Sequence, residues 1–336
     1  PVVICSLGDN SVTEGEVAEA FQFAALHQLP IIFLVQDNEW GISVTKEEAR
    51  TSDAYDYAAG FVGLNRMRID GTDFVESFIQ MQKAVHFVRE ERKPLLVCAK
   101  TVLIGHHTSG VRREFYRDEA DLAKHRAKDP GIILKKYLLE EGFSEETLSQ
   151  IEIEARKQIE EDFNKAILAP DPKPETVKEH VYAPTPITEE KGTRIPENGE
   201  KIPMVDAGIH AIQELMHKHP EALLYGQDVG GRIGGVFREA VTLQQKFGNK
   251  RVFNTAIQEA YIIGSTVGMS AVGLKPIVEV QFADYIYPGI NQLVTEVSKS
   301  CYLSNGKYPV SNIIRVPIGA YGGGGPYHSG SVETML

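Results

Sequence analysis

The chain has 336 residues, of which 42% are hydrophobic, and its formal net charge is −11. This length and composition predict a globular protein of roughly two domains. The acidic balance excludes general affinity for nucleic acid, since phosphate neutralisation needs a basic face. No apolar stretch approaches the roughly 20 residues that cross a bilayer, so we expect no membrane-spanning segment.

The cysteines are Cys5, Cys98 and Cys301, which are odd in number and far apart. They fit neither a disulfide framework nor a metal-binding knuckle, and this predicts a reducing, cytoplasmic location. The chain starts in a strand pattern without a basic leader and ends after a glycine-rich stretch. We therefore expect no signal peptide, and we expect the chain to be a segment of a longer polypeptide.

The first predicted unit is a strand, a helix and a second strand. Residues 2–7 and 31–35 are apolar runs with β-branched side chains, which are typical of buried parallel strands. The helix is expected over 14–27, opened by Thr13 and Glu16 at the spacing of a capping box. Two strands joined by a crossover helix are parallel, and ligands bind at their carboxyl ends.

Asp9 and Asn38 directly follow these two strands, so both are expected at the same edge of the sheet. Carboxylate and amide oxygens are the ligands that Mg²⁺ prefers in proteins. The positive end of the helix after Asp9 would also favour a bound diphosphate. A helix cap and a turn are the alternative interpretation of these two side chains.

The first domain continues with strands expected over 66–69 and 94–100, on either side of a helix over 74–91. The pair His106-His107 then begins a polar, arginine-bearing loop that is expected to reach about residue 127. Two helices follow in the predicted order. Their expected ranges are 131–141 and 145–167, the second opened by Ser144.

Residues 169–201 differ in composition from both flanks, because they are polar, rich in proline and almost without apolar periodicity. The prolines are Pro170, Pro172, Pro174, Pro184, Pro186 and Pro196. This composition predicts an extended linker, with a long surface loop as the alternative. The predicted domains are therefore 1–168 and 202–336.

The second domain repeats the alternation of strands and helices. Helices are expected over 204–217, 237–247, from 259 onward and over 288–303. Strands are expected over 222–225, 251–253, 276–282 and 312–316. The fold class is thus α/β, with two domains whose mostly parallel sheets are flanked by helices.

The first domain resembles the α subunit of the thiamine diphosphate-dependent decarboxylase component of the 2-oxo acid dehydrogenases. The stretches that carry the resemblance are Gly8-Asp9-Asn10, Glu14-Gly15-Glu16, Leu29-Pro30, Asp37-Asn38 and Trp40-Gly41-Ile42-Ser43. The resemblance implies that Asp9, Asn38 and the carbonyl of Trp40 bind Mg²⁺, and that Gly8 and Ile42 contact the cofactor. Asn10 and Asp37 depart from the family's glycine and asparagine.

The stretch Ile104-Gly105-His106-His107 resembles the loop of the branched-chain enzymes, and this implies that His107 is an active-site histidine. A surface histidine pair is the alternative interpretation. Thr108 replaces the regulatory serine of mitochondrial relatives, and Leu103 stands where they usually have arginine. We therefore do not carry over regulation by phosphorylation from those relatives, and this question stays open.

The second domain resembles the β subunit of the same enzyme component. The stretches concerned are residues 251–259, Gln281-Phe282-Ala283-Asp284-Tyr285 and Tyr327-His328-Ser329. The resemblance implies that Glu259 pairs with the aminopyrimidine nitrogen of the cofactor, that Tyr285 stacks near that ring and that His328 is catalytic. Gln227 stands where the family usually has glutamate, and we expect only a minor role for it.

Taken over the chain, the resemblance implies a fused α-β oxidoreductase that uses thiamine diphosphate and Mg²⁺. It would decarboxylate a 2-oxo acid and transfer the acyl group to the lipoyl domain of a dihydrolipoyl acyltransferase. The histidine motifs favour 3-methyl-2-oxobutanoate, a substrate of branched-chain amino acid catabolism. We expect a homo-oligomer, such as a dimer of fused chains, with the site built within one chain or between two.

Other classes of function stay open at this point. A pyruvate or acetoin dehydrogenase component would keep every cofactor residue. A transketolase-like enzyme would not need an acyltransferase partner. A regulatory module that binds a nucleotide or a metal is the non-enzyme alternative.

Overall fold

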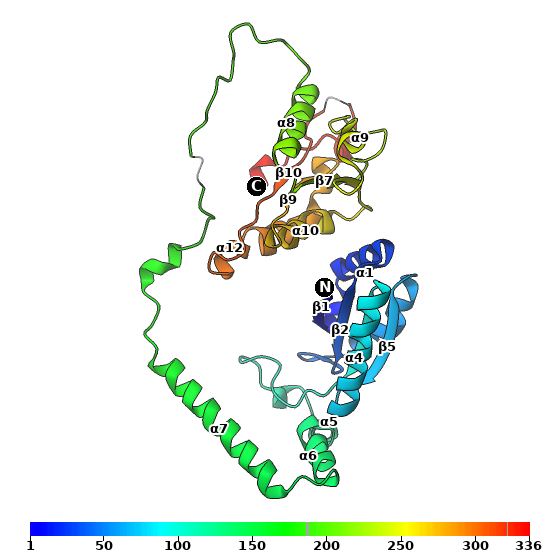
Figure 1. Cartoon of the computed structure of the whole chain (residues 1–336), viewed down its shortest axis with the longest axis vertical. Helices are drawn as coiled ribbons and strands as arrows, with labels where there is room; N and C mark the ends of the chain where they lie inside the picture. The colour runs from blue at the N-terminus through cyan, green and yellow to red at the C-terminus, as the bar shows by residue number, and fades with distance from the viewer. Residues whose placement is uncertain (186–187, 321) are drawn as a thin grey trace. The chain divides into compact units, whose positions relative to one another are not determined.

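The computed structural model describes residues 1–185, 188–320 and 322–336 (Figure 1). The chain folds into two compact units, Pro1–Asp171 and Pro172–Leu336, and each unit has its own four-stranded sheet. All strand pairs within these two sheets are parallel. The predicted α/β fold class with mostly parallel sheets flanked by helices is confirmed.

The sheet of the first unit has the strand order β1-β2-β6-β5. The strands are β1 (Val3–Gly8), β2 (Ile31–Asp37), β6 (Leu95–Lys100) and β5 (Asn65–Asp70). Leu34 of β2 pairs with Ser6 of β1 and with Val97 of β6, so β2 lies inside the sheet. Its side chains Ile32, Phe33 and Val35 are buried, as expected for a strand covered on both faces.

Helices cover both faces of this sheet. On one face, Phe21 of α1 (Gly15–His27) packs with Ala54 of α3 (Ala54–Tyr57). On the other face, Ala84 and Val88 of α4 (Phe74–Glu91) pack against the strands. The remaining elements of the unit are η1 (Asn10–Thr13), β3 (Trp40–Gly41), β4 (Val44–Thr45), α2 (Lys46–Ala49), η2 (Ala58–Gly60), η3 (Arg113–Phe115), α5 (Glu119–Arg126), α6 (Pro130–Glu140) and α7 (Glu145–Leu168).

Two local predictions for the first unit were wrong. Thr13 does not cap α1, because it ends η1 and its hydroxyl donates to the carbonyl of Asn10 at 2.8 Å. The segment before residue 127 is not all loop, since α5 forms there with Asp118 as its N-cap. Its low hydrophobicity hid this helix, which buries only Leu122 and His125.

The sheet of the second unit has the order β10-β9-β7-β8. The strands are β10 (Ile313–Arg315), β9 (Lys275–Glu279), β7 (Ala222–Gly226) and β8 (Val252–Asn254). One face packs against Ile212 and Met216 of α8 (Met204–Lys218). The other packs against Ile262 of α10 (Glu259–Ala271). The other elements are η4 (Pro174–Lys178), α9 (Leu243–Phe247), η5 (Ala283–Tyr285), α11 (Tyr287–Gln292), η6 (Leu293–Val297), α12 (Ser300–Leu303), η7 (Gly325–Tyr327) and η8 (Glu333–Met335).

The prediction of a helix over 237–247 is also wrong for the first half of that range. Arg238 and Thr242 have φ values of 64° and 69°, so the chain is in the left-handed region on both sides of Glu239. A right-handed helix cannot continue through such residues, and only α9 forms. The helix expected over 288–303 is split into α11, η6 and α12.

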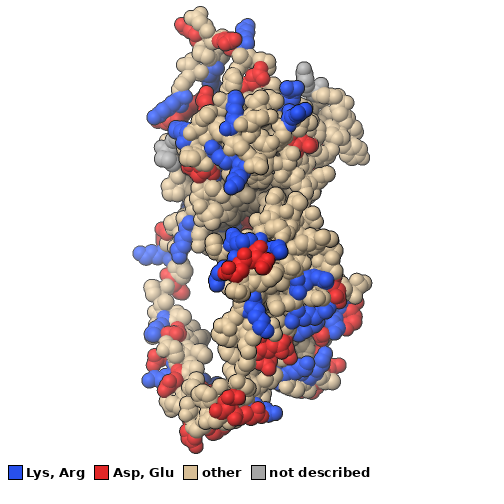
Figure 2. Space-filling model, turned by 45° about the vertical axis from the view of Figure 1, so that its right-hand side comes forward, with Lys and Arg blue, Asp and Glu red and all other residues tan. Residues whose placement is uncertain are grey.

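The proline-rich segment contains η4, and no other helix or strand occurs in its described residues. Pro186 of this segment lies outside the described residues. Among the described residues, no helix is both long enough and apolar enough to cross a membrane. Figure 2 shows positive and negative side chains interspersed over the visible face.

Candidate active site

The carboxyl ends of β1 and β2 bring two of the predicted metal ligands to neighbouring positions. Gly8 pairs with Gln36 at the end of the ladder, and Asp9 follows β1 as Asn38 follows β2. Asp9 is 2% exposed, and its Oδ2 accepts the backbone N–H of Glu39 at 3.2 Å. The Oδ1 of Asn38 accepts the N–H of Trp40 at 2.9 Å.

Arg50 bridges two buried carboxylates at this edge. Its Nη2 lies 2.9 Å from Asp9 and 2.7 Å from Asp37. Lys100, the last residue of β6, pairs with Asp37 as well. Burial alone would raise the pKa of Asp37, but the hydrogen bonds from Lys100 and Arg50 lower it. For Asp9, burial raises the pKa against the attraction of Arg50. The edge thus holds a cation directly beside Asp9.

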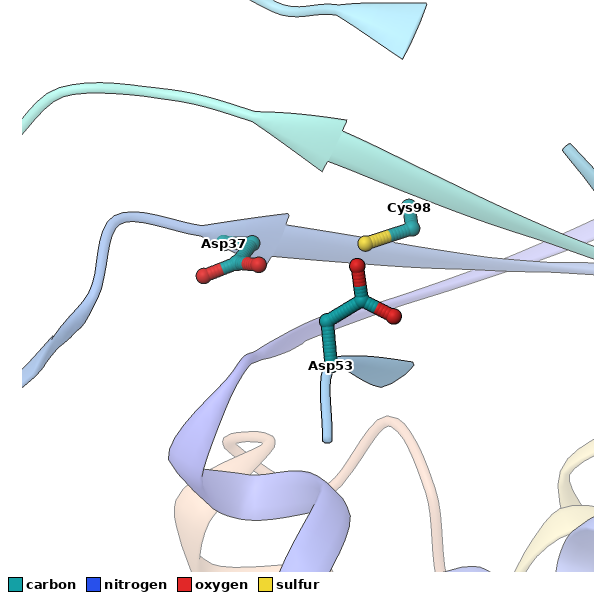
Figure 3. Close-up of side chains that lie close together, drawn as sticks. All are labelled: Asp37, Asp53 and Cys98. Atoms are coloured by element: carbon teal, nitrogen blue, oxygen red, sulfur yellow. The ribbon is translucent and has the colours of Figure 1, made fainter. Parts of the chain in front are cut away.

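A second group at the same edge consists of Asp37, Asp53 and Cys98, whose ligand atoms lie within 4.8 Å of one another (Figure 3). Each carboxylate already has cationic partners, since Arg68 pairs with Asp53 at 3.1 Å. Burial, with the charges of Asp37 and Asp53, raises the pKa of the Cys98 thiol to about 11. Because both carboxylates are paired with cations, the group forms part of a charge network.

The segment after Asn38 is a short hairpin with unusual backbone geometry. Trp40 and Gly41 of β3 pair with Thr45 and Val44 of β4. Ile42, between the strands, has a φ of 60°, which is rare for a β-branched residue and is a form of backbone strain found at functional sites.

Asn10 packs tightly against this hairpin. A Cβ added to Gly41 would lie 1.7 Å from the amide nitrogen of Asn10, so Gly41 makes room for that side chain. Asn10 itself keeps a negative φ. The departure from the motif glycine is therefore accommodated by packing and not by an unusual backbone angle.

The histidine loop is fixed at its base. Leu103 donates its N–H to Nδ1 of the buried His125 at 3.0 Å, and its carbonyl accepts from Arg117 at 2.7 Å. Burial, with the charge of Arg117, lowers the pKa of His125. His106 accepts the N–H of Arg113 at 3.2 Å, whereas His107 is exposed. Within the described residues, no other predicted site residue hydrogen-bonds to His107.

A cavity of about 320 Å³ lies next to the buried His125. Its wall includes Asp37, Glu39, Lys100, Lys124, Lys128 and His125. It lies at the carboxyl ends of β2, β5 and β6, where parallel sheets bind ligands. The charges in its wall are balanced, because Lys100 pairs with Asp37 and Lys124 pairs with Glu39.

Glu259 is the first residue of α10 and is 8% exposed. Its Oε1 accepts the side-chain amide N–H of Gln227 at 2.9 Å. Gln227 is 5% exposed and follows β7. The positive end of the α10 dipole also favours a carboxylate at this position. The amide that we expected to have a minor role is therefore in direct contact with the predicted catalytic acid.

Tyr285 and His328 are brought together from distant parts of the second unit. The Tyr285 hydroxyl lies 2.7 Å from Nε2 of His328. The ring of Phe282 packs edge-on against both, with centroid distances of 5.4 Å and 4.8 Å. Both rings thus have fixed orientations relative to each other.

A further buried acid pair lies at the end of β9, and sequence analysis missed it. Glu279 is fully buried, and its Oε2 accepts from Arg315 at 2.7 Å. Burial and the neighbouring carboxyl of Glu239 raise the pKa of Glu279 to about 9. A Cβ added to Gly235 would lie 2.5 Å from the carboxyl carbon of Glu239, so the glycine loop packs directly over it.

Arg50 and Lys100 were also missed as site residues. Lys100 could have been found, because it ends a predicted strand and parallel strands share one carboxyl edge. Arg50 had no such signal, since it lies in a short irregular segment after α2.

Two family descriptions match this chain. Residues 1–175 match "Dehydrogenase E1 component", and residues 200–336 match "Transketolase, pyrimidine binding domain". The first match covers just over half of the chain. Residues 176–199 of the proline-rich segment separate the two matches.

Individual relatives match about two fifths of the chain. A 2-oxoisovalerate dehydrogenase subunit beta from Pseudomonas aeruginosa is 44% identical over 133 residues, 40% of this chain and 38% of that protein. The Bacillus subtilis protein of the same name is 39% identical over 39% of this chain and 40% of its own length. A pyruvate dehydrogenase E1 component subunit beta from Acholeplasma laidlawii is 40% identical over 40% of this chain and 41% of that protein. The chain spans about two fifths of the length of these relatives.

Proposed function

Because this chain belongs to the dehydrogenase E1 component family, we propose that it carries the cofactor-binding core of a 2-oxo acid dehydrogenase in which α-type and β-type parts share one polypeptide. The observation that carries the proposal is the presence of both family matches, residues 1–175 and 200–336, in a single chain. We assign the diphosphate and metal to 1–168, the pyrimidine to 202–336 and the linker to 169–201.

The residues at the edge of β1 and β2 fit a magnesium diphosphate. Asp9 offers a buried carboxylate, and Asn38 and the Trp40 carbonyl offer neutral oxygens, which is the donor chemistry that Mg²⁺ prefers. The position beside Asp9 already accommodates the positive charge of Arg50. We propose that Gly8 and Ile42 contact the cofactor from the same loops.

The residues of the second unit fit an aminopyrimidine ring. Glu259 is a buried acid, and Gln227 donates to Oε1, one of its two carboxyl oxygens. Tyr285 offers an aromatic face that His328 and Phe282 hold in place. We propose that Glu259 donates a proton to the ring nitrogen, while His107 and His328 bind the substrate carboxylate and move protons. When bound, thiamine diphosphate supplies the electron sink for decarboxylation.

The names of the relatives support a 2-oxo acid as substrate. Both 2-oxoisovalerate and pyruvate occur in those names. We propose 3-methyl-2-oxobutanoate, because the histidine motifs resemble the branched-chain enzymes, with transfer of the acyl group to the lipoyl domain of a dihydrolipoyl acyltransferase. The proposed assembly is a dimer of fused chains, and the free cysteines support a reducing cytoplasm.

The test is acyl transfer to a lipoyl domain by the intact natural polypeptide that contains these residues. We expect turnover that requires thiamine diphosphate and Mg²⁺, and a higher kcat/KM for 3-methyl-2-oxobutanoate than for pyruvate. A preference for pyruvate would overturn the substrate assignment alone. Absence of thiamine diphosphate binding in calorimetry with Mg²⁺ present would overturn the enzyme assignment.

A further inference from the structure

We propose that Gln227 is a positioning residue for Glu259. It holds Oε1 of the carboxyl group, so that Oε2 is the oxygen presented to the pyrimidine ring. This inference rests on the proposed function, because it assigns a role to Glu259. It concerns one hydrogen bond, from Nε2 of Gln227 to Oε1 of Glu259 at 2.9 Å, between two side chains that are 5% and 8% exposed.

The backbone around Gln227 is fixed on both sides. A Cβ added to Gly226 would lie 2.4 Å from the carbonyl oxygen of Glu279. Only glycine, which has no side chain, therefore lets the end of β7 lie this close to β9. Asp228 has a φ of 59°. Its carboxylate accepts from Gln281 at 2.6 Å, and its carbonyl accepts from Gly235 at 2.8 Å. Gln227 is therefore mounted on backbone that has little freedom to move.

The chemistry of the amide decides which oxygen of Glu259 can carry a proton. An amide N–H only donates, so the oxygen that faces it must accept. When Glu259 is protonated, its proton therefore resides on Oε2, because Oε1 faces Nε2 of Gln227. The amide also stays neutral, so Gln227 holds the carboxyl group in the same orientation before and after proton transfer. A glutamate at position 227 could not do this without a proton of its own.

The experiment compares Gln227→Met with the unchanged intact polypeptide. Methionine keeps the length and volume of glutamine and removes the donor. We expect hydrogen exchange at the reactive carbon of bound thiamine diphosphate to slow by about tenfold or more, as for a lost hydrogen bond to a charged group. The affinity for the cofactor should change by less than about threefold, because orientation and not binding is lost. Gln213→Met, which removes a surface amide on α8, should change neither quantity.

A second measurement does not depend on a loaded enzyme. In cofactor-free protein with ¹³C-labelled glutamate, the carboxyl signal of Glu259, assigned by its loss in Glu259→Gln, should shift in Gln227→Met. It should stay in place in Gln213→Met.

The outcomes separate the two proposals. Exchange in Gln227→Met within about twofold of the unchanged protein, together with an unmoved carboxyl signal, would overturn the positioning role and leave the proposed function intact. Equal losses of affinity and exchange would also overturn it, because they indicate a merely structural role. Unimpaired exchange in Glu259→Gln would overturn the assignment of Glu259, and the positioning role with it.

Discussion

The two units surround their buried acids in different ways. In the first unit, the cations Arg50 and Lys100 contact Asp9 and Asp37. In the second unit, a neutral amide contacts Glu259, and Glu279 lies between another carboxyl group and the guanidinium of Arg315. A cation beside a carboxylate favours its charged form, whereas burial and a neighbouring like charge favour the protonated form. The first unit therefore has a cation beside the proposed Mg²⁺ ligand, and the second has a neutral hydrogen-bond donor beside the proposed acid.

The largest expected effect is on the proposed Mg²⁺ site of the first unit. Asp9→Ala removes the buried carboxylate that we propose as an Mg²⁺ ligand, so Mg²⁺-dependent binding of thiamine diphosphate should fall by about 100-fold or more. Calorimetry with and without Mg²⁺ measures this. Asp129→Ala, which removes the N-cap of α6, is the matched control and should bind normally. If Asp9→Ala binds thiamine diphosphate normally, Asp9 is not a ligand of the Mg²⁺ ion.

In the second unit, Glu259→Gln should leave cofactor binding intact and slow proton transfer. The amide keeps the shape of the side chain but cannot transfer a proton, so cofactor affinity should be largely unchanged. Hydrogen exchange at the reactive carbon of the cofactor should slow by about 100-fold or more, in line with lost general acid–base catalysis. If affinity and exchange fall together, Glu259 binds the cofactor without activating it.

Replacing Arg50 tests whether the stability of the first unit depends on a cation between Asp9 and Asp37. Arg50→Met leaves two carboxylates buried without this partner, and we expect the free energy of unfolding to fall by about 3 kcal/mol. Saturating Mg²⁺ should restore part of this loss, because the ion supplies the missing positive charge. Urea unfolding with and without Mg²⁺ provides the measurement.

Arg126→Met is the control, since Arg126 forms an exposed pair with Glu119. This pair should contribute less than about 1 kcal/mol. A loss in Arg50→Met as small as that in the control would contradict a structural role for the bridge.

The last expected effect is a change in the pH dependence of stability of the second unit. The pKa of Glu279 is raised from 4.5 to about 9, so the folded state binds a proton that the unfolded chain releases at lower pH. The stabilisation is present below about pH 4.5 and is lost as the pH rises towards 9. The slope should not exceed about 1.4 kcal/mol per pH unit.

Glu239→Gln removes the like charge, so the fall in stability between pH 5 and 8 should become shallower. Urea unfolding at several pH values measures this slope. Glu221→Gln is the control, because Glu221 pairs with Lys275 at the surface and its pKa is about 2. An unchanged slope in Glu239→Gln would show that the charge of Glu239 does not raise the pKa of Glu279.

The sequence by itself determined the fold class and the edges at which site residues gather. Apolar runs separated by amphipathic helices allow only parallel strands with crossover connections, and this placed Asp9 and Asn38 at neighbouring strand ends. The segment around Glu259 and the resemblance of both halves led to the family. These features are local in sequence, so periodicity and motif spacing can reveal them.

Only the tertiary structure decided the electrostatics of each site. Arg50 reaches Asp9 across 41 positions of sequence, Gln227 reaches Glu259 across 32, and Arg315 reaches Glu279 across 36. Segment 237–242 failed as a helix for the same kind of reason, because Glu239 is packed beneath Gly235 and beside Glu279. Burial and charge pairing depend on which side chains the fold brings together, and no local pattern encodes that.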